Sequence, residues 1–251
     1  MQILLANAKI MFDKADRRPL TTPLFQDTAN TLAKEIARMD IEELARQLNC
    51  NHKIATENMK RYHNFFATEK IPAILAYNGQ AYKHLNAYTF SEKTLEYAQQ
   101  HLWITCFLYG LLRPMDGIVP YRMEHNVSLE ATNDKPVNLF WKDKLTDVLI
   151  NSVKADDGIL IHLSTTEYER LFDWNRVCKE ITVIQPLFYI RQKDDRLKIQ
   201  AVWAKACRGA MVRFILNNQI VTPKELTAFK YDGFEYATQL GEKAFPHFIR
   251  E

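Results

Sequence analysis

The sequence predicts a mixed α/β protein of the α+β kind, built as a single domain with a central mixed sheet and flanking helices. Its 251 residues are 47% hydrophobic and 25% charged, which is a globular composition. A chain of this length buries about three quarters of the surface that its unfolded form exposes. Short apolar runs typical of strands alternate with segments of helical period, and no linker or repeat divides residues 1–251.

The first third of the chain predicts one strand followed by helices. Residues 2–7 are rich in Ile and Leu and predict a short buried strand. Helical periodicity then runs from about 24 to 66, with Asp40 as an N-cap and an interruption at 49–52. Residues 71–77 are a further candidate strand.

The middle of the chain predicts two long helices. Ser91 is a suitable N-cap for the first of them, and residues 139–153 are amphipathic and predict the second. The core stripe expected for the Ser91 helix consists of Leu95, Ala98, Leu102, Cys106 and Tyr109.

The last third predicts strands and then helices. Helical spacing resumes at 208–216, and Thr222-Pro223 caps another short helix. A polar turn at 192–196 indicates the tip of a hairpin. The expected strands are 158–163, 181–190 and 197–206.

Glycine is scarce, with 7 in 251 residues, so the chain holds no GxGxxG and no GxxxxGK[ST] motif. The usual dinucleotide and nucleotide cradles are therefore excluded. The net charge of +3 is only mildly basic, so the positions of the cations matter more than their number.

The cysteines and histidines predict no metal site and no cofactor. The cysteines are far apart, and no histidine pair has zinc-ligand spacing. Cys106 and Cys207 lie in apolar stretches, which favours buried, reduced thiols over disulfides. No apolar run is long enough to span a bilayer and no signal sequence follows Met1, so we expect a cytoplasmic protein without membrane contact.

The densest polar segment is 109–124, where two glycines and two prolines predict an extended loop. Arg113, Tyr121 and Arg122 are candidate anion donors, and Asp116 and Glu124 could orient them or transfer protons. A rigid loop held by Arg–carboxylate pairs explains the segment equally well.

A second group of cations is Lys205, Arg208 and Arg213. Lys205 and Arg208 flank the predicted strand-to-helix turn, where backbone N–H groups also attract anions. Arg208 and Arg213 are five residues apart and do not share a helix face. The anion site is therefore carried by Lys205 and Arg208, with ordinary surface solvation as the alternative.

Ser164 and Glu167 follow the strand expected at 158–163. Ser164 or Thr165 could cap a helix, and Glu167 would complete a capping box with Ser164. Ser164 lacks the G-x-S-x-G elbow of a nucleophile, so capping is favoured over catalysis. Their position at a strand end still suits a residue that lines a cleft.

Two short helices at 41–48 and 54–62 are joined by a polar connection beside Lys53 and Arg61. Such a pair can sit on a phosphate backbone, although an ordinary helical hairpin with a solvated face is more frequent.

Together these segments resemble the YaaA family of bacterial peroxide-stress proteins, nearly from end to end. Ala6 and Asn7 stand where the family has Ser and Pro, and Gln80 stands where an Asp is usual. The matching positions are Ala8-Lys9, Gly79, Tyr82, Tyr109-Gly110, Arg113-Pro114, Asp116, Pro120-Tyr121-Arg122, Glu124, Phe140-Trp141, Leu163-Ser164, Glu167-Tyr168, Lys205, Arg208-Gly209, Met211, Arg213 and Phe214.

The resemblance implies a mixed α/β fold with a basic cleft and a helix-hairpin-helix-like DNA-binding element, which corresponds to residues 41–63. It also implies protection against hydrogen peroxide by limiting free iron and the oxidation that iron drives. The connection at 49–53 lacks the glycine that lets backbone amides approach phosphates in such hairpins.

The leading hypothesis is a stress-response protein that binds duplex or distorted DNA without sequence readout, through a basic cleft lined by Lys9, Arg113, Arg122, Lys205 and Arg208. The rival is an enzyme acting on a phosphorylated or anionic small molecule or nucleotide in the same cleft. Its candidate catalytic residues are Tyr121, Glu124, Ser164 and Glu167. The candidate anion-binding residues are Lys9, Lys53, Arg61, Arg113, Arg122, Lys205, Arg208 and Arg213.

Overall fold

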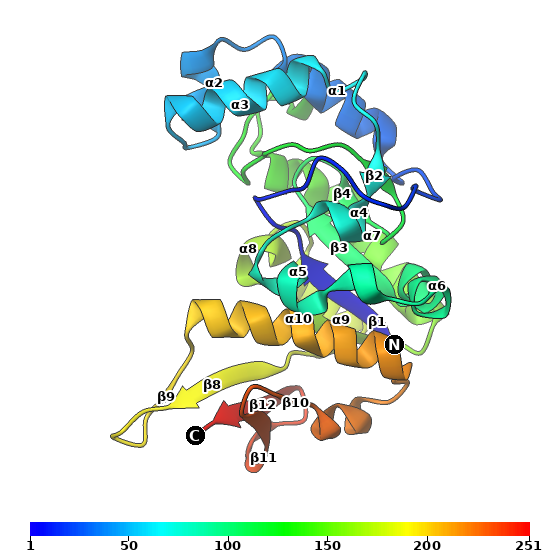
Figure 1. Cartoon of the computed structure of the whole chain (residues 1–251), viewed down its shortest axis with the longest axis vertical. Helices are drawn as coiled ribbons and strands as arrows, with labels where there is room; N and C mark the ends of the chain where they lie inside the picture. Colours follow the sequence, from blue (N-terminus) through cyan, green and yellow to red (C-terminus); the bar gives the residue numbers. More distant parts are fainter.

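The central sheet is mixed and has the strand order β4-β3-β1-β6-β7 in the computed structural model, which describes residues 1–251 (Figure 1). β1 pairs in parallel with β3 on one side and with β6 on the other, whereas β4 runs antiparallel to β3. The α+β class with a central mixed sheet is thus confirmed. The strands are β1 (Gln2–Ala6), β3 (Leu102–Cys106), β4 (Gly110–Leu112), β6 (Ile159–Leu163) and β7 (Thr182–Ile184).

The direction in which successive strands are added to the sheet reverses between β1 and β6. From β1 the next strands, β3 and β4, are added on one side, and β6 and β7 are added on the other. Connections therefore diverge at the carboxyl ends of β1 and β6, which leaves a crevice there. In open α/β sheets ligands bind in such a crevice.

Helices α1 (Gln26–Ile36), α2 (Ile41–Gln47) and α3 (His52–His63) form one end of the molecule (Figure 1). The N-cap predicted at Asp40 is confirmed, since its side chain accepts a hydrogen bond from the Glu43 amide. Asn49, in the connection between α2 and α3, has a φ of 44°. An asparagine thus occupies the left-handed conformation for which glycine is the usual residue.

The middle of the chain differs from the prediction at two places. Only Ile71–Pro72 (β2) is extended, pairing with β5 (Gly117–Ile118), and Ala73–Ala76 is helical (α4). Ser91 caps α6 as predicted, but that helix ends at His101. The stripe expected to be helical continues beyond His101 as strand β3. The prediction failed there because a short, fully buried apolar run has the same sequence pattern in a strand and in a helix.

The other elements of this region are helices. The long amphipathic helix is confirmed as α7 (Val137–Ala155). The remaining elements are α5 (Gln80–Leu85), η1 (Ala87–Thr89), α6 (Glu92–His101), η2 (Glu130–Thr132), α8 (Thr166–Glu169) and α9 (Trp174–Glu180).

A second sheet of strand order β10-β11-β12-β8-β9 lies beyond α10 (Ala201–Asn218) in Figure 1. The strand predicted at 181–190 is divided between the two sheets, and the hairpin tip at 192–196 is confirmed. The strand predicted at 197–206 is wrong beyond Lys198, because α10 begins at Ala201. The elements are β8 (Leu187–Arg191), β9 (Leu197–Lys198), η3 (Pro223–Ala228), β10 (Lys230–Tyr231), β11 (Phe234–Glu242) and β12 (Phe245–Arg250).

Helix α10 packs against α5 on one side and β8 on the other. Nine of its residues are buried, as expected for a helix covered on more than one face. A core of 68 buried residues extends from Met1 to Phe248 and includes Cys106 and Cys207, both free thiols as predicted.

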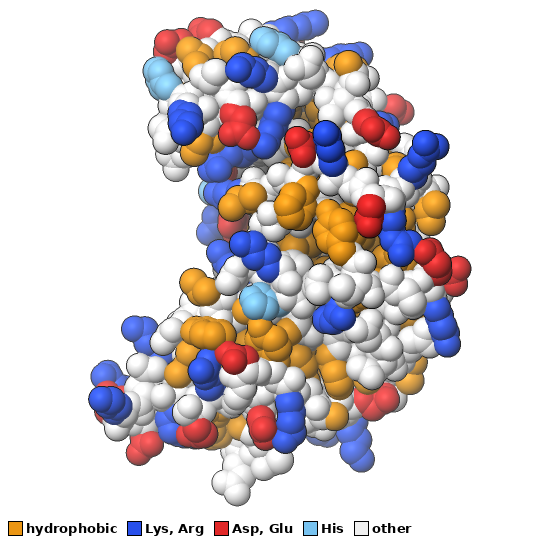
Figure 2. All heavy atoms as spheres, in the orientation of Figure 1, with side chains coloured by type: hydrophobic (Ala, Val, Ile, Leu, Met, Phe, Trp, Pro, Cys, Tyr) orange, Lys and Arg blue, Asp and Glu red, His pale blue; other side chains and the backbone are white.

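The outline of the molecule is hollowed on one side, between the end formed by α1–α3 and the end formed by α10 and β8–β9. Figure 2 shows Lys and Arg side chains along this hollow. No helix is long and apolar enough to cross a membrane.

Candidate functional site

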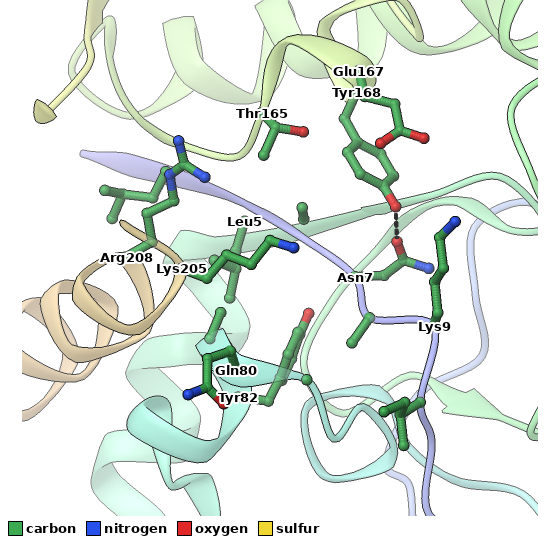
Figure 3. Close-up of a pocket in the computed structure, with 16 residues that line it drawn as sticks. Leu5, Asn7, Lys9, Gln80, Tyr82, Thr165, Glu167, Tyr168, Lys205 and Arg208 are labelled. Carbon is green, nitrogen blue, oxygen red and sulfur yellow. Dashed lines mark hydrogen bonds between the residues drawn. The ribbon is translucent and has the colours of Figure 1, made fainter. Parts of the chain in front are cut away.

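A pocket of about 350 Å³ lies at the carboxyl ends of β1 and β6, where the order of the strands diverges (Figure 3). Four segments far apart in the sequence form its walls. They are residues 5–10 after β1, 79–82 at the start of α5, 163–168 after β6, and Lys205 with Arg208 on α10. The parallel pairing of β1 with β6 brings the first and third segments together.

Lys205 and Arg208 are the cations of the pocket. Both lie inside α10 rather than beside a strand-to-helix turn, so the predicted contribution of a helix N-terminus is wrong. Three residues apart, they share one helix face. Neither makes a salt bridge or side-chain hydrogen bond, and burial lowers the pKa of the Arg208 guanidinium. Arg208 therefore holds a partly desolvated charge with no anionic partner.

Arg213 has a structural contact instead. Its guanidinium donates to the backbone oxygens of Leu85 and Asn86 at 3.1 and 3.0 Å and to the Thr89 hydroxyl at 2.8 Å. It fixes the end of α5 against α10 and does not line the pocket.

Tyr82 points its ring toward the pocket, and its buried hydroxyl has no hydrogen-bond partner (Figure 3). Burial raises its pKa well above 10, so the group is a neutral phenol. Buried hydroxyls in proteins almost always have a partner. An unpaired one facing a pocket is therefore available to a ligand.

A second tyrosine, Tyr168, donates to the Asn7 side-chain oxygen across the pocket (Figure 3). The Asn7 amide in turn donates to the Tyr121 hydroxyl at 3.3 Å, and Tyr121 lies 2.8 Å from the Tyr77 hydroxyl. Tyr121 is thus in the core and reaches the pocket only through Asn7. This chain of hydrogen bonds fixes the orientation of the Asn7 amide.

Beside the pocket, the buried Glu124 carboxylate holds two cations. Lys9 Nζ lies 2.7 Å from Glu124 Oε2, and Arg122 Nη2 lies 2.8 Å from Glu124 Oε1. Tyr62 on α3 donates to the Arg122 backbone oxygen at 2.7 Å, which ties this segment to the α1–α3 end. Lys9 remains 54% exposed and lines the pocket.

The remaining acid candidate, Glu167, lines the pocket and lies 3.6 Å from His125 Nδ1. Ser164 is fully buried, with Thr105 Oγ1 at 3.4 Å as its side-chain neighbour. Thr165, one of the two predicted caps, occupies the N-cap position of α8, but no side chain caps that helix, so the predicted capping box is wrong.

Arg113 lies at the opposite end of the sheet from the pocket, because β4 runs antiparallel to its neighbours. It donates to the Gln2 side-chain oxygen and the Gln100 backbone oxygen, each at 3.1 Å, and stacks 3.4 Å from the Trp103 ring centroid. The expectation that it lines the same cleft as Lys205 is therefore wrong. The turn at 113–116, which follows β4, is held by the Asp116 carboxylate, which accepts from the Arg113 backbone N–H and from the Thr21 hydroxyl.

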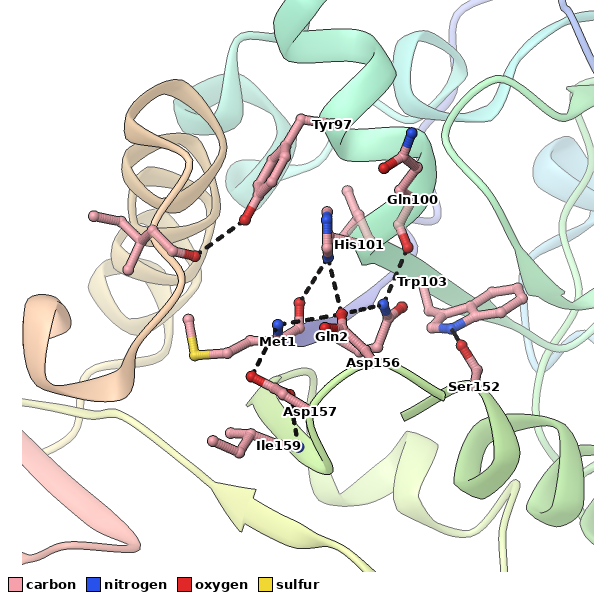
Figure 4. Close-up of polar contacts among 12 residues, drawn as sticks. Met1, Gln2, Tyr97, Gln100, His101, Trp103, Ser152, Asp156, Asp157 and Ile159 are labelled. Atoms are coloured by element: carbon pink, nitrogen blue, oxygen red, sulfur yellow. Dashed lines mark hydrogen bonds and ion pairs between the residues drawn. The ribbon is translucent and has the colours of Figure 1, made fainter. Parts of the chain in front are cut away.

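The amino end of the sheet carries its own polar cluster, drawn in Figure 4. Asp156 accepts hydrogen bonds from the Gln2 amide at 2.9 Å and the Met1 ammonium at 3.2 Å, and lies 3.0 Å from His101 Nδ1. This cluster joins the starts of β1, β3 and β6. Its contacts are all internal, so it stabilises the sheet.

The two candidates on α3 lie away from the pocket. Lys53 is exposed, and Arg61 donates to Glu57 at 2.5 Å and Asn58 at 3.4 Å. No group of three or more His, Cys, Asp or Glu side chains is placed to hold a metal ion.

Residue-by-residue reasoning missed Asn7, Tyr82, Thr165 and Tyr168 as pocket residues. The available signal was position, since Asn7 ends the strand predicted at 2–7 and Thr165 lies two residues after the strand predicted at 158–163. Ala6, Asn7 and Gln80, at which the chain departs from the YaaA pattern, all line this pocket.

Comparison with known proteins gives matches along the whole chain. The family described as "Peroxide stress protein YaaA" matches residues 1–240. A UPF0246 protein of Bacteroides thetaiotaomicron is 42% identical over 97% of this chain and 96% of its own. Those of Porphyromonas gingivalis and Legionella pneumophila are 39% and 32% identical, each over 100% of this chain and 100% and 99% of their own.

Proposed function

The chain belongs to the YaaA family of peroxide stress proteins, and on this premise we propose that it binds DNA through phosphate contacts along the hollow of Figure 2. The family assignment gives it a role in the peroxide stress response. Binding to DNA without sequence readout is the biochemical activity that we assign to this role.

The observation that carries the proposal is the pair of cations without partners, Lys205 and Arg208. Most arginines of the chain bond to a carboxylate or carbonyl, whereas the Arg208 guanidinium is partly desolvated and free. A phosphate oxygen would restore the missing partner. Glu124 holds Lys9, which lies across the pocket from this pair, and Arg122, and these two would extend the row of cations along the hollow.

Lys53 and Arg61 on α3 would supply further contacts at the other end of the hollow. The positive φ of Asn49 gives the α2–α3 connection the turn that a hairpin needs without a glycine. We propose that this element, residues 41–63, acts as a helix-hairpin-helix-like clamp on the same DNA.

Salt dependence of binding tests the proposal. Affinity for duplex, bubble and junction DNA is measured by fluorescence anisotropy, starting at low salt. Each phosphate contact adds about 0.9 to the slope of log K against log salt. Lys205→Ala should reduce the slope by about 0.9, while Lys224→Ala on η3, at the far end of α10, should leave it unchanged. Absence of binding at low salt would refute the proposal.

We extend the proposal to the limitation of iron-driven oxidation, with DNA binding as its basis. Cells that lack the protein are exposed to peroxide, and chelatable iron and strand breaks are measured. Lys205→Ala with Arg208→Ala should fail to restore protection. Full protection by this double variant would separate the stress role from DNA binding.

The rival function is an enzyme acting on an anionic small molecule. It is favoured by the presence of Glu167, Tyr82 and Thr165 beside the cations, because phosphate tracking alone needs only cations. A thermal-shift screen of metabolites and nucleotides separates the two functions. If only polyanions stabilise the protein, the enzyme hypothesis is refuted.

A further inference from the structure

The pocket has the size of a site for one small molecule and is too small for a helical strand. Its volume of about 350 Å³ lies near the lower end of the range of roughly 300–1,000 Å³ for small-molecule sites. Its floor is apolar, formed by Leu5, Ala6, Ala8 and Leu163. A flat, largely apolar ring is the kind of group that such a floor accepts.

Polar groups at the walls suit the edge of a nucleobase. The Tyr82 hydroxyl is buried and has no partner, so it can donate or accept one hydrogen bond. Asn7 keeps one N–H after donating to Tyr121, and the Glu167 carboxylate can accept from an amino group. Bases present both donors and acceptors along their edges.

Cations lie on both sides of the pocket. Lys205 and Arg208 approach from α10, and Lys9 approaches from the opposite side (Figure 3). A nucleotide within a strand has a phosphate on each side, whereas a free mononucleotide carries its phosphate at one end. The arrangement therefore favours a nucleotide that is part of a strand.

An exposed apolar side chain stands at the rim. Ile10 lines the pocket, follows Lys9 directly, and is 65% exposed. Proteins that disrupt base stacking insert apolar side chains of this kind between bases.

We infer that this pocket receives one nucleotide extruded from the bound DNA strand, with Ile10 occupying the space that its base leaves. The inference rests on the proposed DNA binding. The phosphates on either side of the extruded nucleotide contact Lys9 and the Lys205–Arg208 pair, and Tyr82 and Asn7 bind the base. The energetic cost is unpairing and unstacking, which is lowest at a mismatch.

The test compares two duplexes that differ only in one central base pair, matched or mismatched, at the same low salt. We expect the mismatched duplex to bind about tenfold more tightly, because part of the unpairing cost is already met. A 2-aminopurine placed at the mismatch should change its fluorescence when the protein binds. Tyr82→Phe and Ile10→Ala should each reduce the preference.

Matched controls separate a local effect from a general loss of structure. Tyr97→Phe removes a hydroxyl that donates to the Ile220 backbone oxygen outside the pocket, and Val221→Ala shortens a side chain that is 59% exposed. Both should keep the wild-type preference. Ile10 is largely exposed, so Ile10→Ala should fold even if Tyr82→Phe does not.

The outcomes distinguish this inference from the proposed function. Equal affinity for both duplexes with unchanged 2-aminopurine fluorescence would refute extrusion while leaving DNA binding intact. No binding to either duplex would refute DNA binding itself and, with it, the extrusion. Deoxynucleoside monophosphates that bind as tightly as the mismatched duplex would show that the pocket takes free nucleotides instead.

Discussion

Gly209 on α10 packs directly against the backbone of Ala81 on α5, and its substitution tests how the pocket is held together. A Cβ atom at this position would lie 1.8 Å from the Ala81 backbone oxygen and 2.6 Å from its carbonyl carbon. Ordinary contact begins near 3.4 Å, so the two helices would have to separate by about 1.6 Å. The obstacle is backbone, which cannot rotate away as a side chain can.

We expect Gly209→Ala to lower the free energy of unfolding by about 2 kcal/mol. Overpacking of a core costs roughly 1–3 kcal/mol, and the higher helix propensity of alanine returns up to about 1 kcal/mol. The backbone clash places the cost near the top of this range. Because Ala81 and Tyr82 line the pocket from α5 and Arg208 lines it from α10, DNA affinity should fall as well.

Urea denaturation followed by circular dichroism measures the change. The control is Val202→Ala, on the same helix and 61% exposed, which should alter the unfolding free energy by less than about 0.5 kcal/mol. A Gly209→Ala protein as stable as the wild type would refute the close packing of α10 on α5.

Three further predictions concern the two ends of the sheet. Arg113→Lys should lower the unfolding free energy by about 2 kcal/mol, since lysine cannot reproduce the forked hydrogen bonds, while the salt slope of DNA binding stays unchanged. Burial opposes ionisation of Asp156, but hydrogen bonds from Gln2 and the Met1 ammonium and the nearby His101 outweigh it and lower its pKa below 3.8. The unfolded state therefore binds more protons, so the stability advantage of wild type over Asp156→Asn, measured by urea denaturation, should be full above about pH 5 and disappear as the pH falls through the folded-state pKa. Gln80→Glu places a carboxylate in the pocket with the free cations and should weaken DNA binding about fivefold in anisotropy titrations; unchanged affinity would contradict the assigned role of those cations.

Strands β1 and β6 of the central sheet were predictable, because they are short apolar runs with clear turn boundaries. The errors arose where a buried strand and a buried helix have the same composition. The run Leu102–Cys106 continues the apolar spacing of a well-capped helix, and its pairing with β1 and β4 makes it a strand. The segment after Lys198 shows the opposite error. It was predicted as a strand, but it belongs to helix α10, which is buried on more than one face.

The site was predictable in its residue types but not in its geometry. Lys205, Arg208 and Glu167 were recognised as candidates in their own segments, and Lys9 through the resemblance to the YaaA family. That Arg113 lies at the other end of the sheet follows from the antiparallel direction of β4, which no local pattern encodes. The unpaired hydroxyl of Tyr82 could not be predicted from the sequence either, because it depends on the absence of a hydrogen-bond partner among residues that only the fold brings near it.

The most direct test of the account is the salt slope of DNA binding for the double variant Lys205→Ala/Arg208→Ala. If both cations contact phosphates, the slope should fall by about 1.8 relative to the wild type, while that of Lys224→Ala stays at the wild-type value. Slopes that are equal for the double variant, the control and the wild type would contradict the assignment of this pocket to DNA.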